Sequence, residues 1–289
     1  MPNRPGHGAP GAGGQLASVM AIVNRTPDSF YDRGATFAVD KAVKRAGEAV
    51  ADGASIIDVG GVKAGPGASV SPAEEIDRVV PVIAAVRGAH PGVTISVDTW
   101  RAEVAEAAIA AGADLINDTW AGYDPELIEV AGSARVGYVC SHTGGAVPRT
   151  RPHRVHYDDV VADVIAETTA LAERAVAAGA PEGNVFIDPT HDFGKNTFHG
   201  LEILRQVDEL VATGWPVLMA LSNKDSVGET VGRPVGERVA GTLAATAWAA
   251  ARGVAAFRVH QVAETVDVIR MTAAIQGVAP PVNTVRGLA

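Results

Sequence analysis

Short apolar runs alternate along the chain with longer alanine-rich stretches whose apolar residues recur every three or four positions. The short runs are typical of buried strands and the longer stretches of amphipathic helices. Repeated strand-helix pairs indicate a parallel sheet, because a helix supplies the crossover that parallel strands need. Eight strands are predicted, over residues 18–23, 55–59, 94–97, 114–117, 136–139, 185–187, 216–219 and 256–259.

Helices are predicted in the intervening stretches, for example over 101–111, 158–178, 236–251 and 262–275. An open doubly wound sheet would also alternate in this way. Eight consecutive units without a linker favour closure into a (β/α)8 TIM barrel, an α/β fold with a single domain. We expect this barrel over residues 16–276, between a flexible Gly/Pro-rich arm at 1–15 and a tail at 277–289.

Charge and cysteine content limit the partners. The formal net charge of -9 argues against nucleic acid or an anionic membrane as a partner, so an anionic ligand must be held by local cations. Cys140 has no second cysteine to pair with, and the sequence has neither a long apolar run nor a secretory signal. These features predict a cytoplasmic protein.

Polar residues stand at the carboxyl end of almost every predicted strand, where a barrel carries its active site. A single polar residue there often does no more than cap the next helix. Eight strand ends converging on one rim indicate a site instead. The residues are Asn24, Asp58, Asp98, Asn117 with Asp118, His142, Asp188, Ser222 with Lys224, and Arg258 with His260.

The residue types at this rim predict two kinds of contact. Asp98, Asn117 and Asp188 offer acceptors and an amide, which suit a planar, nitrogen-rich heterocycle; a buried structural network is the alternative. Arg258 and His260 are two residues apart and therefore face the same way on a strand. With Asn24 and Lys224, they could hold a phosphate or pyrophosphate.

The sequence offers one candidate metal ligand and none of the common nucleotide-binding motifs. The side-chain oxygen of Asn24 suits Mg2+ beside such phosphates. The sequence contains neither a Walker A loop nor a Rossmann glycine fingerprint. Its eight histidines are not at zinc-binding spacing, and a single cysteine argues against a soft-metal site.

From about Val19 onward the chain resembles the dihydropteroate synthase family. The motifs are Val23-Asn-Arg-Thr-Pro-Asp-Ser-Phe30, Ile57-Asp-Val-Gly-Gly61, Ser96-Val-Asp-Thr99, Ile116-Asn-Asp118, Asp188-Pro189 with Phe193-Gly-Lys-Asn196, Ser222-Asn-Lys224 and Arg258-Val-His260. The resemblance implies a homodimeric barrel that acts in folate biosynthesis. Such a transferase joins 6-hydroxymethyl-7,8-dihydropterin pyrophosphate to 4-aminobenzoate and releases pyrophosphate with the help of Mg2+.

The resemblance also assigns roles by position. It places Asp98, Asn117, Asp188, Phe193 and Lys224 in a pterin pocket. It makes Asn24, Arg258 and His260 the pyrophosphate anchors, with Asn24 as the metal ligand. The catalytic set is then Asp98, Lys224, Arg258 and His260. Pyrophosphate leaves before the amine attacks in this family, so Asp98 would stabilise a cationic pterin.

Departures from the family pattern fall on the side of the second substrate. The second loop usually reads Gly-Gly-Glu-Ser-Thr-Arg-Pro-Gly, whereas this chain has Gly60-Gly-Val-Lys-Ala-Gly-Pro-Gly67. The usual Ser-Arg-Lys is Ser222-Asn-Lys224. The expected degenerate aminobenzoate site comprises Lys63, Ala64, Gly65, Ser222 and Asn223.

Loss of an Arg contact to an anionic substrate costs a few kcal/mol, and about 1.4 kcal/mol corresponds to a tenfold change in rate. Loss of two such contacts is therefore expected to leave little synthase activity. Lys63 and Arg25 carry the right charge to compensate, but Lys lacks the planar fork of Arg and Arg25 belongs to a different loop. Further departures are Tyr31 and Arg33 in the first loop and Asp192 where Gly is usual.

The chain resembles still more strongly the divergent second paralogue of mycobacteria and their relatives, a subgroup thought to lack synthase activity. The segments are His142-Thr-Gly-Gly-Ala146, Pro148-Arg-Thr-Arg-Pro152 and Thr284-Val-Arg-Gly-Leu288. The leading hypothesis is therefore a barrel that binds the pterin pyrophosphate but has lost or retuned its aminobenzoate site. Alternatives are an active synthase, a non-catalytic pterin sensor and, less favoured, a pterin-linked methyl carrier.

Overall fold

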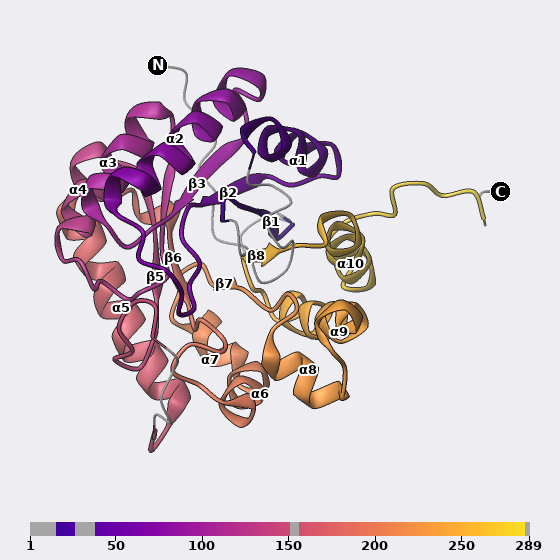
Figure 1. Ribbon diagram of the computed structural model, residues 1–289. Coiled ribbons are helices and arrows are strands. Elements are labelled where there is room, and N and C mark those ends of the chain that lie inside the picture. The colour runs from indigo at the N-terminus through magenta and orange to yellow at the C-terminus, as the bar shows by residue number, and fades with distance from the viewer. Residues whose placement is uncertain (1–15, 27–37, 151–155, 287–289) are drawn as a thin grey trace.

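The computed structural model describes residues 16–26, 38–150, 156–286 of the chain. The predicted arm at 1–15 lies outside the described residues, as do Tyr31, Arg33, Pro152 and Leu288. Described residues beyond the last helix, 276–286, form neither helix nor strand and lead away from the body of the molecule (Figure 1).

Eight parallel strands form one sheet that curls into a barrel, and helices surround it (Figure 1). The strands are β1 (Ser18–Asn24), β2 (Ile56–Gly60), β3 (Thr94–Asp98), β4 (Leu115–Asp118), β5 (Gly137–Ser141), β6 (Val185–Asp188), β7 (Leu218–Met219) and β8 (Ala256–Val259). Their order is β6-β5-β4-β3-β2-β1-β8-β7. The predicted TIM barrel is thereby confirmed, and the open doubly wound sheet is excluded.

The barrel closes between β6 and β7 through a short seam. Ile187 and Val217 form an isolated parallel bridge, and the Ile187 N–H donates to the Pro216 carbonyl at 2.9 Å. Pro216 was predicted as the start of a strand, but β7 begins only at Leu218. A proline has no N–H to offer to a ladder, which accounts for the late start.

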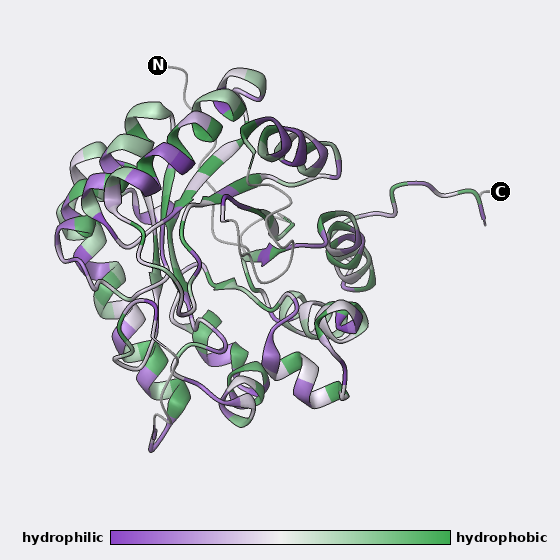
Figure 2. Ribbon diagram, in the orientation of Figure 1, coloured by the Kyte–Doolittle hydropathy of each residue, from purple (hydrophilic) through white to green (hydrophobic). Residues whose placement is uncertain are grey.

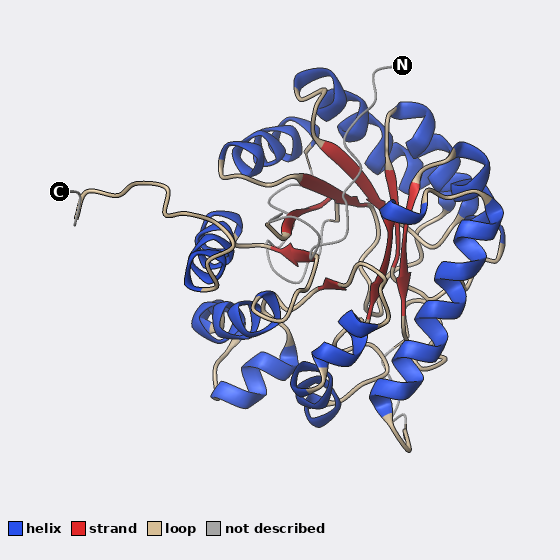
Figure 3. Cartoon of the chain, turned by 180° about the vertical axis from the view of Figure 1, so that it is seen from behind, coloured by secondary structure: helices blue, strands red, loops and turns tan. Residues whose placement is uncertain are grey.

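Most helices lie between consecutive strands on the outside of the barrel (Figure 3). The described residues contain α1 (Val39–Ala51), α2 (Pro72–Ala89), α3 (Ala102–Ala111), α4 (Glu126–Ala134), α5 (Val160–Ala178), α6 (Thr197–Arg205), α7 (Val207–Ala212), α8 (Asp225–Val231), α9 (Val239–Ala250) and α10 (Val262–Ile275), with 3-10 turns η1 (Glu182–Asn184) and η2 (Val235–Glu237). None of these described helices is both long enough and apolar enough to cross a bilayer.

Two of the predicted helices begin later than the sequence pattern suggests. The helix predicted from 158 begins at Val160, because the Asp159 side chain accepts hydrogen bonds from the Val161 and Ala162 N–H groups. The helix predicted over 236–251 is divided at Arg238 into η2 and α9.

Strand residues alternate between two apolar cores, and Figure 2 shows green residues along the strands. The larger core lies between strands and helices and includes Val59, Val97 and Ile116. The second fills the barrel interior. It comprises Met20, Ile56, Leu115, Val139, Phe186, Leu218, Ala255 and Ala256. Alternation places every second residue of a strand on the same face, so the strand residues two positions after Ile56, Leu115, Phe186 and Ala256 also point inward.

Candidate active site

The inward-facing positions change from apolar to polar as each strand approaches its carboxyl end. Leu115 of β4 is followed two residues later by Asn117, and Phe186 of β6 is followed by Asp188. On β8, Ala256 is followed by Arg258. The strand period of two therefore places a polar rim directly above the apolar interior of the barrel.

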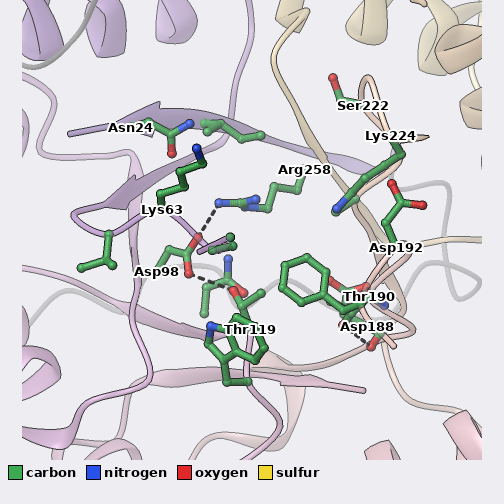
Figure 4. Close-up of a pocket in the computed structure, with 18 of the residues that line it drawn as sticks. Asn24, Lys63, Asp98, Thr119, Asp188, Thr190, Asp192, Ser222, Lys224 and Arg258 are labelled. Carbon is green, nitrogen blue, oxygen red and sulfur yellow. Dashed lines mark hydrogen bonds and ion pairs between the residues drawn. The ribbon is translucent and has the colours of Figure 1, made fainter. Parts of the chain in front are cut away.

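A pocket of about 360 Å³ opens at this rim, within the size range of small-molecule sites (Figure 4). Almost all residues predicted for the site line it. They are Asn24, Lys63, Ala64, Gly65, Asp98, Asn117, Asp188, Phe193, Ser222, Lys224, Arg258 and His260. Asn223 is the exception among the predicted residues, since it is fully buried and does not line the pocket.

Arg258 holds the centre of the pocket through two carboxylates from different strands. Its Nε donates to Asp58 Oδ2 and its Nη2 to Asp98 Oδ2, each at 2.6 Å. Figure 4 shows the contact with Asp98. Burial lowers the pKa of Arg258, but Asp58 and Asp98 more than offset this effect and raise the pKa above its ordinary value. The guanidinium is therefore charged and fixed in orientation at any working pH.

Asp98 and Asp188 face the pocket as hydrogen-bond acceptors with unusual acidity. Burial raises the pKa of Asp98 to about 6 against the opposing charge of Arg258. Burial likewise raises the pKa of Asp188 to about 6, although the Thr190 N–H donates to Asp188 Oδ1 at 2.7 Å. Both groups are carboxylates at neutral pH and become protonated in mild acid.

Lys224 and two aromatic rings form another wall of the pocket. The Lys224 Nζ lies 5.1 Å from the centroid of the Phe193 ring. Phe193 in turn meets Trp120 edge to face at 5.2 Å. Burial lowers the pKa of Lys224, while the nearby carboxylate of Asp192 opposes this effect. This wall combines a flat apolar surface with a cation, which suits the edge and face of a planar ring.

Ser222 and His260 are linked at the ends of neighbouring strands. Ser222 Oγ lies 3.0 Å from His260 Nδ1, accepts from the His260 backbone N–H at 3.2 Å and donates to Gln261 Oε1 at 2.9 Å. These contacts fix the His260 ring at the rim, on the side of the pocket that Lys224 and Arg258 also reach.

Oxygen donors meet where β1, β2 and β3 end. A Cβ atom at Gly60 would lie 3.5 Å from Asn24 Oδ1 and 3.6 Å from Asp98 Oδ2. Glycine at this position therefore leaves space between an amide oxygen and a carboxylate. Figure 4 shows the Lys63 side chain reaching toward the same part of the pocket.

Comparison with known proteins decides the family. A model described as "Pterin binding enzyme" matches residues 20–260. The chain belongs to this family. Proteins named "Inactive dihydropteroate synthase 2" from Mycobacterium bovis and Mycobacterium leprae are each 64% identical to it, covering 96% and 94% of this chain and 88% and 94% of their own lengths.

Solved structures of the family share the fold. Dihydropteroate synthase from Xanthomonas albilineans with 4-aminobenzoic acid superposes with a TM-score of 0.83 at 40% identity. The match covers 92% of this chain and 95% of that one. The sequence-based assignment to the family is thus confirmed, including the likeness to mycobacterial relatives that are named inactive.

Some residues that depart from the family pattern line the pocket, and others do not. Lys63, Ala64 and Gly65 line the pocket, whereas the Asn223 side chain turns away from it. Asn223 Nδ2 approaches Gln261 Oε1 at 3.5 Å, and the residue has a left-handed φ of 57°. Arg25 is buried, and its Nε donates to the Arg78 carbonyl on α2 at 3.0 Å.

Asp192 has a structural role in this chain. Its carboxylate accepts hydrogen bonds from the Asp225 N–H at 2.6 Å and the Ser226 N–H at 3.2 Å, the first two residues of α8. Its φ of 71° lies in the left-handed region, where the family's usual Gly is unstrained. Asp192 therefore fixes the start of the helix that follows Lys224.

Several residues that line the pocket, or that bind the side chains lining it, were not predicted as site residues. Asp58 was noted only as a polar strand end, yet it accepts from both Arg258 and Asn117, the latter at 3.2 Å. Thr119 and Thr190 also line the pocket. The Thr119 hydroxyl donates to Asp98 Oδ1, and the Thr190 backbone N–H donates to Asp188 Oδ1. The strand period would have identified Asp58, because it lies two residues beyond the interior residue Ile56.

Proposed function

We propose that this chain binds 6-hydroxymethyl-7,8-dihydropterin pyrophosphate in the rim pocket and has little or no dihydropteroate synthase activity, because its aminobenzoate site is degenerate. The observation that carries the proposal is the asymmetry of the pocket. Acceptors and cations suited to the pterin and pyrophosphate converge there, whereas the second loop offers Ala64 and Gly65 where the family usually has Thr and Arg.

The pterin half of the proposal rests on the acceptors. Asp98, Asn117 and Asp188 come from three strands and all line the pocket. Ionised Asp98 and Asp188 would accept from the ring N–H and amino groups of a pterin, and the Phe193 side chain would border its face. A site built from such acceptors discriminates strongly against rings that lack those donors.

The pyrophosphate half rests on charge and on Asn24. Lys224, Arg258 and His260 line one pocket and would bind and stabilise the departing anion. Asn24 Oδ1 faces the space above Gly60, and an amide oxygen there fits a hard cation such as Mg2+. Mg2+ held by Asn24 and by phosphate oxygens would neutralise charge on the leaving group.

The aminobenzoate half of the proposal rests on cations that the pocket lacks. A second anionic substrate needs its own cation, and Asn223 replaces the usual Arg while lying outside the pocket. Arg25 does not line the pocket either, and its Nε is directed toward α2. Lys63 remains in the second loop, on the side of Asn24 and Arg258 (Figure 4). We propose that Lys63 assists the pyrophosphate rather than the aminobenzoate.

Isothermal titration with the pterin pyrophosphate, with and without Mg2+, tests the binding half. We expect saturable binding that Mg2+ strengthens. The variant Asp188→Asn, which keeps the size of the side chain, is expected to bind at least about tenfold more weakly. Absence of both heat and a thermal shift at saturating ligand would contradict the proposal.

Pyrophosphate release and growth complementation test the catalytic half. We expect only background release with 4-aminobenzoate, and no growth of a strain that lacks its own dihydropteroate synthase despite soluble expression. Growth would establish the alternative of an active synthase. Binding without turnover for a panel of arylamines would favour the alternative of a pterin sensor over a synthase with a different acceptor.

We also propose a cytoplasmic homodimer. Phe198, Val231 and Trp248 are exposed on α6, α8 and α9, which pack against one another and present apolar surface to solvent. The buried, unpaired thiol of Cys140 agrees with a reducing compartment. Light scattering that gives the mass of a single chain at micromolar concentration would contradict the dimer.

A further inference from the structure

A histidine and two carboxylates form a cluster away from the pocket. His142 follows β5, while Asp163 and Glu167 lie one turn apart in the first half of α5. His142 Nε2 is 2.9 Å from Asp163 Oδ2 and 3.4 Å from Glu167 Oε2. One ligand atom from each residue lies within 4.8 Å of the other two. Three donors from two elements thus converge on one point.

The His142 ring is oriented toward this point. Its side chain has no exposed surface, whereas Asp163 and Glu167 are 43% and 47% exposed. Its Nδ1 has no hydrogen-bond partner among the described residues, so both of its polar side-chain contacts are with the two carboxylates. Imidazole nitrogen is a common metal ligand in proteins, and this one lies beside two carboxylate oxygens.

The two carboxylates repel one another, and among the residues that the structure describes no Lys or Arg side chain forms an ion pair with either of them. Like charges four residues apart destabilise a helix. Lys195 is nearby, but its Nζ donates to the carbonyl oxygens of His142 and Phe193 at 2.9 and 3.0 Å. Among the described residues it forms no ion pair with either carboxylate.

We propose that His142, Asp163 and Glu167 bind one Zn2+ ion, with water completing a four-coordinate site. One imidazole and two carboxylates are a donor set that Zn2+ accepts and that Mg2+, which prefers only oxygen, does not. Ligands about 2.1 Å from a tetrahedral Zn2+ lie about 3.4 Å apart. The separations of the His142 nitrogen from the two carboxylate oxygens, 2.9 and 3.4 Å, require only small side-chain adjustments.

The proposed ion would stabilise the rim of the pocket. It would join the loop after β5 to α5, and Lys195 connects the His142 carbonyl to that of Phe193, which lines the pocket. The site is independent of the proposed pterin function and of the Asn24 position. Sequence spacing gave no sign of it, because its ligands belong to a strand end and a helix that follow one another only after 21 residues.

Zn2+ titration of untagged, full-length protein stripped with a chelator tests the site, with metal analysis after dialysis. We expect one Zn2+ per chain and an increase in melting temperature. Substituted Co2+ is expected to give the intense visible absorption of a four-coordinate ion. An excess of Mg2+ should not displace either ion.

The variant Asp163→Asn/Glu167→Gln removes the charge of two partly exposed ligands and leaves His142 in place, so folding is preserved. We expect its Zn2+ affinity to fall at least about a hundredfold, more than the loss of an outer-shell partner causes. The matched control is Asp158→Asn, because exposed Asp158 Oδ1 lies 3.6 Å from exposed His156 Nε2. The control should bind like the unchanged chain. Equal affinity in all three proteins, or no stoichiometric Zn2+, would overturn the proposal.

Discussion

Arg258 connects the proposed pterin half of the pocket, through Asp98, with the proposed pyrophosphate half. Its guanidinium binds Asp58 and Asp98 through different nitrogens, and the remaining edge faces the pocket that His260 and Lys224 also line. A planar fork held in this way presents a fixed donor to an anion, which a flexible ammonium does not.

The substitution Arg258→Lys is therefore expected to weaken binding of the pterin pyrophosphate by about 1.5–3 kcal/mol, or roughly tenfold to more than a hundredfold. Binding of 6-hydroxymethylpterin, which lacks the pyrophosphate, should weaken much less. Calorimetry with both ligands separates the two effects, and denaturant unfolding checks that the variant is folded. An equal loss for both ligands would argue against an anion-binding role.

Asp98 and Asp188 predict how binding depends on pH. Each has a pKa raised to about 6, mainly by burial, and only the ionised form accepts hydrogen bonds on both oxygens. Protonation below pH 6 removes these acceptors, so the affinity for 6-hydroxymethylpterin should rise between pH 5 and pH 7. The ligand without pyrophosphate is chosen because phosphate oxygens also titrate near pH 6.

Calorimetric titration at pH 5, 6 and 7 measures this rise. In Asp188→Asn, one of the two titrating carboxyls is gone, and the curve should be flatter as well as lower. An affinity that is the same at pH 5 and pH 7 in the unchanged chain would contradict ionisation of these groups in the binding step.

At the scale of elements, two glycines in helices show opposite constraints. A Cβ at Gly132 in α4 would lie 2.2 Å from the Ala178 carbonyl oxygen at the end of α5, so only glycine permits these helices to approach. Gly88 near the end of α2 is exposed, and a Cβ there would meet no atom within 4 Å. Packing decides the first residue, and nothing in the structure requires the second.

We expect Gly132→Ala to lower the free energy of unfolding by about 3 kcal/mol, because the backbones of α4 and α5 must separate. Gly88→Ala is the matched control and should raise it by about 0.5–1 kcal/mol through better helix propensity. Urea unfolding followed by circular dichroism measures both. A small effect at Gly132 would mean that the α4 and α5 pair can shift without loss of packing.

For the whole molecule, the barrel is closed unevenly. β1 and β2 pair over five residues, whereas β6 and β7 meet only through the bridge between Ile187 and Val217. A seam with few ladder hydrogen bonds opens at lower free energy than the rest of the sheet. The same seam leads from Asp188 on one side to Ser222 and Lys224 on the other, so its opening would widen the pocket.

Hydrogen exchange followed by mass spectrometry tests this difference. Amides of residues 217–219 are expected to exchange faster than those of β1, and bound pterin pyrophosphate should slow exchange at the seam more than elsewhere. Uniform exchange across all eight strands would contradict a weak seam.

The sequence by itself determined the fold class and most of the pocket. Apolar runs alternating with amphipathic stretches specify strand-helix units, and eight such units close as the observed barrel. Several residues at the strand ends line the pocket, because the carboxyl ends of parallel strands share one rim. Asn24, Asp98, Asp188 and Arg258 follow this rule.

Where two polar residues are adjacent at a strand end, only the tertiary structure decided which of them lines the pocket and which contacts hold its side chain there. Asn117 lines the pocket, whereas adjacent Asp118 faces the other way and accepts from the Tyr138 hydroxyl at 2.7 Å. Asn223 sits between two pocket residues but points away from the pocket, since its backbone is left-handed. Such choices depend on strand register and on local φ, and contacts between residues distant in the chain, such as Arg258 with Asp58, exist only after the barrel has closed.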